Sequence, residues 1–396
     1  MSGPAVYLAA LGVVSALGPG VQALRAGLWA AEPGGVSPTE ACSPGRMLAL
    51  GCVPGPLPAL HEALPRALRS RNNALLAAAL QELRTAVEGA IARFGPRRVA
   101  VVLGTSAAGV AEGDAAARRR LSHGDWPADY DYAQQEMGSA SAFLARELGT
   151  CGPAHVISTA CSSGAKALAS GARLLRAGLA DAVVAGGVDA LGRLTVAGFG
   201  ALESVAAQRC NPMSVNRCGI NIGEGAALFL MTREPGPVRL AGWGESSDAH
   251  HMSAPEPSGR GAVEAMRQAL QRAGMAPQAV DYLNLHGTAT PQNDAMESRA
   301  VAELLGLDTP VSSTKPLTGH ALAAAGAIEA AIAWLTLVDN PQGRLPPHWW
   351  DGQRDPALPP LCLAAPGETL GRAPRHVLSN SFAFGGSNAA LLFAGA

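Results

Sequence analysis

The chain has 396 residues, a length that allows one large α/β domain or two medium ones. Hydrophobic residues make up 48% of it and charged residues 15%, which excludes a disordered chain. Its 30 basic and 31 acidic side chains give a formal net charge of −1, so no global field attracts nucleic acid or an anionic membrane surface.

Seven cysteines occur without a C-x-x-C pair, which predicts reduced thiols rather than a disulfide framework or a structural zinc site. His250 and His251 lack a third ligand at metal spacing, so no metal site is expected. The apolar start, residues 1–18, has no basic region, and Gly12 and Gly18 interrupt it well short of the ~20 apolar residues of a membrane span. The sequence therefore predicts a cytoplasmic protein without a signal peptide or a membrane span.

Strands and helices alternate in the first part of the chain. Short apolar and β-branched runs predict strands over residues 5–11, 99–103, 154–158, 182–185 and 226–231. Gly186 and Gly187 are expected to stop the fourth of these strands. Helix-forming segments predict helices that open near Gly20 and that cover residues 74–83 and 162–177.

A passage rich in Pro and Gly, residues 234–261, separates this part from a second one with the same alternation. There the pattern predicts helices over 262–274, 294–305 and 322–338, and strands over 282–285, at Val311 and over 389–393. The segments VVLGTSAAG and YLNLHGTAT are similar, as are ISTACSSGAKALASGARLL and SSTKPLTGHALAAAGAIEA. An internal duplication would bring these loops together near the carboxyl ends of the strands.

Cys161, in STACSSG, is the first candidate for chemistry because it lies where a predicted strand gives way to a helix. The positive end of the helix dipole is expected to lower the pKa of its thiol and favour the thiolate. Its small neighbours leave room for an acyl group. On the residues alone, a nucleophile and a buried structural cysteine are about equally good interpretations.

Two histidines and a lysine are further candidates. His286 follows a predicted strand in LHGTATP, and His320 heads a helix of small residues; a core histidine and a capping histidine are the plainer interpretations. Lys315 is one of only two lysines in the chain. Gly385 and Gly386 in NSFAFGGSN permit close backbone approach, so free N–H groups there could stabilise an oxyanion, although a simple turn would look the same.

In combination, these segments resemble the β-ketoacyl-acyl-carrier-protein synthases, the decarboxylating condensing enzymes of the thiolase fold. The resemblance covers nearly the whole chain and rests on six stretches in this order: ISTACSSGAKAL, GGVDAL…GFGALES, NIGEGAALFLM, LHGTATPQND, SSTKPLTGHALAAAGAIEA and NSFAFGGSNAALLF. It implies an α/β, thiolase-like fold with duplicated βαβαβαββ halves, residues 1–235 and 236–396, that form a five-layered αβαβα sandwich.

The resemblance also implies roles for individual residues. Cys161 would be the nucleophile that takes the acyl chain from the 4′-phosphopantetheine of an acyl carrier protein, with no other cofactor. His286 and His320 would bind the malonyl thioester carbonyl as neutral Nε2 donors. Backbone N–H groups of Cys161 and Phe384 would form the oxyanion hole. Lys315 would hold the site electrostatically, paired with Glu297 or Glu329.

Other family positions concern the substrates. The resemblance places substrate contacts at Thr288, Thr290, Ala107, Phe199, Phe382 and Gly385, with the two threonines on the pantetheine arm and Phe384 as a gate between the half-reactions. Ala107 stands where long-chain synthases often carry a bulkier residue, which predicts a longer or wider acyl pocket. With NIGEGAALFLM, it suggests polyene-type products such as aryl polyenes beside ordinary fatty-acid elongation.

The expected partners are an acidic carrier protein and a second subunit. Arg66, Arg69 and Arg71 cluster before a predicted helix where the family docks its carrier, although a solvated helix face explains them equally well. The family fold is dimeric, so we expect a homodimer or a heterodimer with a Cys-less homologue.

Some alternatives remain open at this stage. One is a structural partner of the chain-length-factor type, which Cys161 and the two histidines disfavour. Another is a coenzyme A-dependent thiolase or acyltransferase. The chain also reads Pro212-Met213-Ser214 where the family often has P-F-D, and this leaves an ion pair to Arg217 in doubt.

Overall fold

The computed structural model describes residues 3–395; residues 1, 2 and 396 lie outside it. Its strands are β1 (Tyr7–Ser15), β2 (Gly18–Pro19), β3 (Ser37–Thr39), β4 (Leu48–Leu50), β5 (Val99–Gly104), β6 (Ala154–Ile157), β7 (Ala182–Asp189), β8 (Gly225–Thr232), β9 (Val238–Ser247), β10 (Tyr282–Asn284), β11 (Pro310–Ser312), β12 (Cys362–Leu363), β13 (His376–Ala383) and β14 (Ser387–Gly395). Its α-helices are α1 (Gly20–Leu28), α2 (Arg71–Phe94), α3 (Val110–His123), α4 (Ser139–Leu148), α5 (Ser163–Arg176), α6 (Arg193–Ala201), α7 (Arg260–Ala273), α8 (Pro291–Leu305), α9 (Lys315–Thr318) and α10 (Ala325–Leu337).

The two halves of the chain repeat one topology. In the first half the strand order is β1-β8-β7-β5-β6, with two antiparallel pairings followed by two parallel ones. In the second half the order β9-β14-β13-β10-β11 has the same sequence of pairings. Along the chain, the order β1-α2-β5-α4-β6-α5-β7-β8 in the first half matches β9-α7-β10-α8-β11-α10-β13-β14 in the second, and the first half has further elements such as α1, α3 and α6 between them. The predicted duplication of a βαβαβαββ unit is therefore confirmed.

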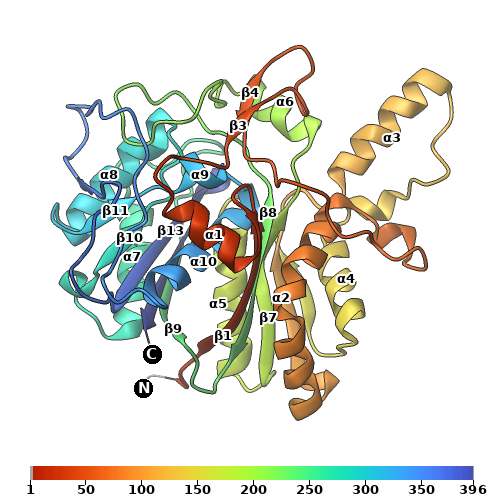
Figure 1. Cartoon of the computed structure of the whole chain (residues 1–396), viewed down its shortest axis with the longest axis horizontal. Helices are drawn as coiled ribbons and strands as arrows, with labels where there is room; N and C mark the ends of the chain where they lie inside the picture. The colour runs from red at the N-terminus through yellow and green to blue at the C-terminus, as the bar shows by residue number, and fades with distance from the viewer. Residues whose placement is uncertain (1–2, 396) are drawn as a thin grey trace.

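Helices and sheets form the expected five layers (Figure 1). Among residues 3–395, the β1–β9 pairing joins the strands of both halves into one 12-stranded sheet. Helices α2 and α4 cover the outer face of its first half, and α7, with α8 packed beside it, covers the outer face of its second half. Helices α5 and α10 pack against each other and against strands of both halves. The largest apolar cluster surrounds this central pair, because a helix between two sheets must be apolar on most sides.

Several predicted elements have different limits in the structure. Strand β7 does not stop at Gly186 and Gly187, as predicted, but continues through both. These glycines allow close packing within the sheet, because a Cβ on Gly186 would lie 1.9 Å from the Ala227 carbonyl oxygen. The passage 234–261 contains the ten-residue strand β9, which its flanking Pro and Gly residues concealed. Helix α2 spans 24 residues rather than the predicted segment 74–83.

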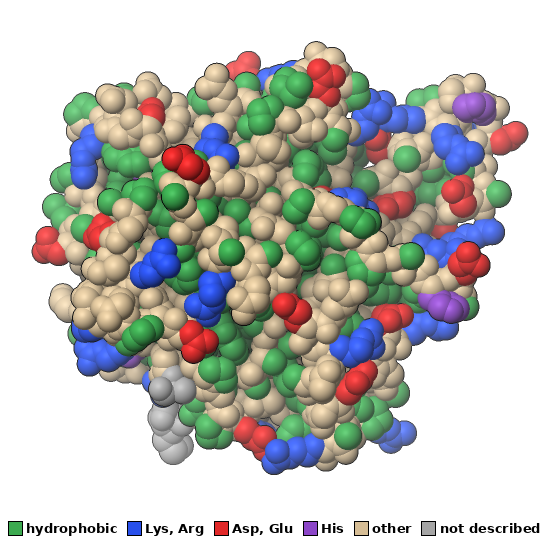
Figure 2. Space-filling model, viewed as in Figure 1, with side chains coloured by type: hydrophobic (Ala, Val, Ile, Leu, Met, Phe, Trp, Pro, Cys, Tyr) green, Lys and Arg blue, Asp and Glu red, His purple; other side chains and the backbone are tan. Residues whose placement is uncertain are grey.

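Within residues 3–395, no helix is both long enough and apolar enough to cross a bilayer. On the face shown in Figure 2, basic and acidic side chains are interspersed, and many of them surround the projecting helix α3. This mixed surface agrees with the formal net charge of −1.

Candidate active site

Cys161 lies in a tight turn between β6 and α5. Ala160, just before it, has a φ of 51°, in the left-handed region that costs a non-glycine residue free energy. Ser163 holds this turn: its hydroxyl accepts the Thr159 N–H at 2.8 Å and donates to the Ala160 carbonyl at 2.6 Å. The turn places Cys161, whose exposed fraction is only 6%, at the start of the central helix α5.

Burial raises the pKa of the Cys161 thiol to about 12, while the charge of Lys315 acts in the opposite direction. The prediction of a lowered pKa was therefore wrong, because desolvation by side chains such as Leu322 and Ala383 outweighs the helix terminus. His320 Nε2 lies 3.0 Å from the sulfur, within hydrogen-bond distance of it.

The structure brings Cys161, His286 and His320 together from different parts of the fold. His286 follows β10, and His320 lies between α9 and α10. The sulfur and the nearest ring nitrogens of the two histidines all lie within 4.8 Å of one another. The two imidazole rings meet edge to face, with their centroids 5.2 Å apart. The predicted meeting of loops from both halves is thus confirmed.

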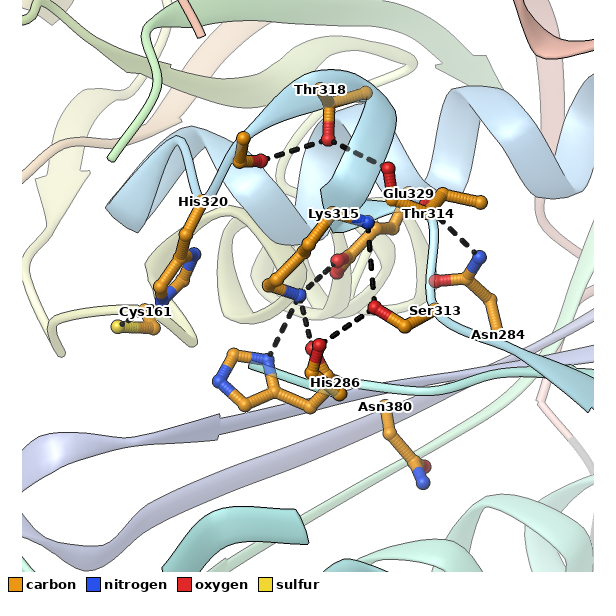
Figure 3. A network of polar contacts seen from close by, with 12 residues as sticks. Cys161, Asn284, His286, Ser313, Thr314, Lys315, Thr318, His320, Glu329 and Asn380 are labelled. Atoms are coloured by element: carbon orange, nitrogen blue, oxygen red, sulfur yellow. Dashed lines mark hydrogen bonds and ion pairs between the residues drawn. The ribbon is translucent and has the colours of Figure 1, made fainter. Parts of the chain in front are cut away.

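Lys315 fixes the orientation of His286 (Figure 3). Its ammonium group donates to the backbone carbonyl of His286 and lies 3.5 Å from the ring Nδ1. Since an ammonium group can only donate, Nδ1 accepts and the proton of the neutral ring is on Nε2. Nε2 is the nitrogen that the resemblance assigns to the substrate carbonyl.

Two buried carboxylates divide the support of this site between them. Of the two candidates, Glu329 pairs with Lys315, at 2.5 Å. Glu297 instead accepts the backbone N–H groups of His286 and Gly287, each at 2.7 Å. Burial raises the pKa of both carboxyl groups to about 7, and for Glu329 the Lys315 ammonium opposes the shift.

Both histidines are neutral. Burial lowers the pKa of His286 and of His320 well below the ordinary value, and the charge of Lys315 lowers both further. A neutral imidazole can donate a hydrogen bond without carrying a buried charge. This state agrees with the prediction of two neutral donors.

A pocket leads from the surface to the sulfur. It encloses about 630 Å³, including its mouth, and its lining includes Cys161, Phe199, Ser253, Pro255, His286, Thr288, Thr290, His320, Phe382 and Phe384. The hydroxyl groups of Thr288 and Thr290 lie on the wall of the pocket and are hydrogen bonded to each other, with their oxygens 2.9 Å apart. The Phe199 and Phe384 rings lie 5.7 Å apart, as expected for side chains that narrow a passage.

Two predicted substrate residues lie elsewhere. Ala107 is buried but is not among the residues that line this pocket; its N–H is hydrogen bonded to Asp189 at 2.8 Å. Gly385, with a φ of 81°, is also outside the lining, and its N–H donates to the Met252 carbonyl at 2.8 Å. Gly385 thus acts on the shape of the loop that carries Phe384.

The three predicted docking arginines have different surroundings. Arg71 forms a 2.5 Å ion pair with Glu224, whose side chain is buried. Arg69 donates to the backbone carbonyls of Glu62 and Leu64. Arg66 is exposed and donates to a carbonyl oxygen of a neighbouring loop. Arg71, whose side chain is 40% exposed, thus combines a structural ion pair with a position at the surface.

Sequence reasoning missed part of the site. Ser253 and Pro255, which line the pocket, come from the passage that was interpreted as a separator between halves. The ion pair of Arg217, in doubt from the sequence, is made by Asp355 of a later loop at 2.5 Å. A partner 138 residues away in the chain gives no local sequence signal.

The three side chains at the base of the pocket are also of the kinds that bind metal ions. Cys161, His286 and His320 have the right atom types for a zinc ion. The Lys315 ammonium group, 3.5 Å from a ring nitrogen of His286, adds positive charge where a dication would bind. The chemistry of the site therefore favours an organic substrate over a metal ion.

A buried thiol beside two neutral histidine donors, in a duplicated α/β fold, defines a thiolase-like architecture suited to thioester chemistry. Residues 67–235 match the Beta-ketoacyl synthase, N-terminal domain, and residues 238–348 match the Beta-ketoacyl synthase, C-terminal domain. The chain belongs to the β-ketoacyl synthase family.

Individual relatives agree with this assignment. The structure of the ketosynthase ApeO in complex with its chain length factor ApeC from Xenorhabdus doucetiae is 45% identical, with a TM-score of 0.94 over 99% of this chain and 98% of that one. The ishigamide ketosynthase/chain length factor is 27% identical, with a TM-score of 0.88 over 100% of both chains. The mitochondrial 3-oxoacyl-[acyl-carrier-protein] synthase of Arabidopsis thaliana is 35% identical over 286 residues, which cover 64% of this chain and 59% of that protein.

Proposed function

We propose that the protein is a β-ketoacyl-acyl-carrier-protein synthase. It joins an acyl group bound to Cys161 with a malonyl group on an acyl carrier protein, with release of carbon dioxide. The observation that carries the proposal is the convergence of the Cys161 sulfur and two neutral imidazoles within 4.8 Å at the base of one pocket.

In the first half-reaction, the Cys161 sulfur attacks the carbonyl carbon of the acyl thioester. A new thioester bond forms at Cys161 and the carrier thiol leaves, with the proton that left Cys161. The Nε2–H of His320, 3.0 Å from the sulfur, is placed to stabilise the thiolate by a hydrogen bond as this proton leaves. The charge of Lys315 favours the thiolate, against the effect of burial.

In the second half-reaction, the malonyl thioester carbonyl accepts hydrogen bonds from Nε2 of His286 and His320. Its bond to the carboxylate breaks, carbon dioxide leaves, and the electron pair remains as an enolate that these donors stabilise. The enolate carbon attacks the acyl-Cys161 carbonyl, whose developing oxyanion is assigned to the backbone N–H groups of Cys161 and Phe384. Collapse expels the Cys161 thiolate, which takes up one proton.

The substrates and partners follow from the pocket and from the relatives. The paired hydroxyls of Thr288 and Thr290 fit the amides of a phosphopantetheine arm. We therefore propose that both substrates are bound to the phosphopantetheine of an acyl carrier protein and that the reaction uses no other cofactor. Two similar solved structures are complexes or assemblies of a ketosynthase with a chain length factor. We propose a heterodimer with a Cys-less homologue, with a homodimer as the alternative.

Arg66, Arg69 and Arg71 remain the proposed docking residues for the carrier protein, and Arg71 also forms an ion pair with Glu224. Seven cysteines without a C-x-x-C pair support a reducing compartment, the cytoplasm. A polyene-type acyl chain stays a hypothesis alongside fatty-acid elongation.

The deciding experiment is turnover with a panel of acyl-carrier proteins, saturated and polyunsaturated, in the presence of malonyl carrier protein. Mass spectrometry should find the acyl group on Cys161 before malonyl carrier is added, and β-ketoacyl product afterwards. A chain with only a structural role would form neither. Acceptance of coenzyme A thioesters alone would point to a thiolase or acyltransferase, and strict preference for saturated chains would reject the polyene hypothesis.

A further inference from the structure

Asp189, at the end of β7, has a fully buried side chain that accepts hydrogen bonds from two separate loops. Its Oδ1 accepts the Thr105 hydroxyl and the N–H groups of Ser106 and Ala107, each at 2.8 Å. Its Oδ2 accepts the Ser106 hydroxyl at 2.5 Å and the Ala323 N–H at 2.8 Å. Both oxygens are thus committed to donors on the protein, and three of these donors are backbone groups.

The bond to Ala323 holds the turn that carries His320. Ala323 lies three residues after His320, in a single 3₁₀ turn over Leu322–Ala324. Leu322 has a φ of 47°, a conformation that an L residue keeps only where its surroundings enforce it. Leu322 also packs against Cys161. A small movement of this turn would therefore move His320 relative to the sulfur.

Glycines close the junction between this turn and the helix of the nucleophile. A Cβ on Gly164 in α5 would lie 2.7 Å from the Ala323 carbonyl oxygen, and one on Gly187 in β7 would lie 2.8 Å from the same oxygen. Such distances leave no room for a side chain. The turn after His320, helix α5 and strand β7 therefore pack together without space between them. The Asp189 carboxylate links β7 to this turn by its hydrogen bond with the Ala323 N–H.

From this arrangement, we infer that Asp189 is a positioning residue that sets the contact between His320 and Cys161. It touches neither the sulfur nor the pocket, and it acts through the Ala323 N–H. The importance of this role for catalysis rests on the proposed function. The contact between His320 and Cys161 can be probed without carrier substrates.

Asp189→Asn is a selective probe of this role. An asparagine offers one oxygen and one NH₂ group in place of two oxygens. If the NH₂ group faced Ser106 and Ala107, it would oppose two backbone donors. If it faces Ala323 and the Ser106 hydroxyl, it opposes one backbone donor, because the hydroxyl can turn and accept. The favoured orientation therefore breaks the bond to the His320 turn.

The rate of Cys161 alkylation by iodoacetamide measures the contact directly. We expect Asp189→Asn to slow alkylation about tenfold, because misplacement by about an ångström weakens the hydrogen bond between His320 and the reacting sulfur. The charge effect has the opposite sign: Asp189 raises the pKa of the Cys161 thiol, so loss of its charge alone would accelerate alkylation. Asp189→Glu, which keeps the charge but not the geometry, should also be slow.

Two controls make the result decisive. In a His320→Ala background, Asp189→Asn should no longer slow alkylation, since the residue acts through His320. Asp281→Asn removes another buried carboxylate that accepts backbone N–H groups, at Arg375 and His376, and should leave the rate unchanged. In turnover, Asp189→Asn should lower kcat and leave KM for the acyl carrier unchanged.

The inference is overturned if folded Asp189→Asn is alkylated as fast as the parent, or if the slowing persists without His320. Should Asp189→Asn fail to fold, Asp189→Glu decides the question alone, since unchanged alkylation in that variant would overturn the role. An inactive parent enzyme that still shows the Asp189 effect on alkylation would refute the proposed function and leave this inference intact.

Discussion

The two halves share a topology but contribute different chemistry. After β6, the first half presents a sulfur in a strained turn that the Ser163 hydroxyl holds. After β10 and β11, the second half presents two histidines supported by buried Lys315, Glu297 and Glu329. The comparison teaches that a duplicated frame can assign covalent chemistry to one copy and stabilisation of developing charge to the other.

The division is tested most strongly at the sulfur. Cys161→Ala should abolish condensation, by at least about a thousandfold, because no covalent intermediate can form. It should retain decarboxylation of malonyl carrier protein, since both histidines of the second half remain. Release of carbon dioxide and formation of β-ketoacyl product are measured in parallel. Loss of both reactions would show that the halves are not separable.

The reciprocal change is in the second half. His286→Ala should lower decarboxylation by about a hundredfold to a thousandfold, because a donor to the developing enolate is lost. Acylation of Cys161 should persist, since His320 still contacts the sulfur. Single-turnover acylation followed by mass spectrometry checks this. Equal losses in both reactions would contradict the assignment.

The buried ion pair between Lys315 and Glu329 in the second half is expected to contribute to the stability of the fold. Lys315→Met should destabilise the fold by about 3–5 kcal/mol, because it leaves Glu329 buried and unpaired. The matched double variant with Glu329→Gln should recover much of the loss. Urea unfolding of the parent, both single variants and the double variant gives the coupling between the two side chains. Additive effects would indicate that the pair is not energetically linked.

The smallest effect is expected at the surface of the first half. Arg66→Glu should raise KM for carrier substrates about threefold to tenfold at unchanged kcat, because a docking charge is reversed. Arg71→Glu is the informative contrast, since it faces Glu224 with a like charge and should lower the unfolding midpoint instead. Unchanged KM for Arg66→Glu would reject the docking assignment.

The sequence was informative where a property is local. The place of Cys161 followed from a strand-to-helix switch, and the duplication followed from similar segments in each half. The direction of its thiol pKa did not follow, because burial comes from Leu322 and Ala383, which are distant in the chain. Likewise, the ion pair between Arg71 and Glu224 did not follow, because the two residues are 153 positions apart in the chain. Burial and pairing arise from tertiary structure.

Strained backbone at the pocket has a consequence for engineering. Ala160, Ala289 and Leu322, each beside a side chain of the site, have φ values of 51°, 65° and 47°. Glycine or asparagine at such positions typically relieves ~1 kcal/mol of strain. A screen for heat resistance would therefore select these exchanges first. The selected variants would be more stable but slower, because the backbone strain that they lose holds the reacting atoms in their productive positions.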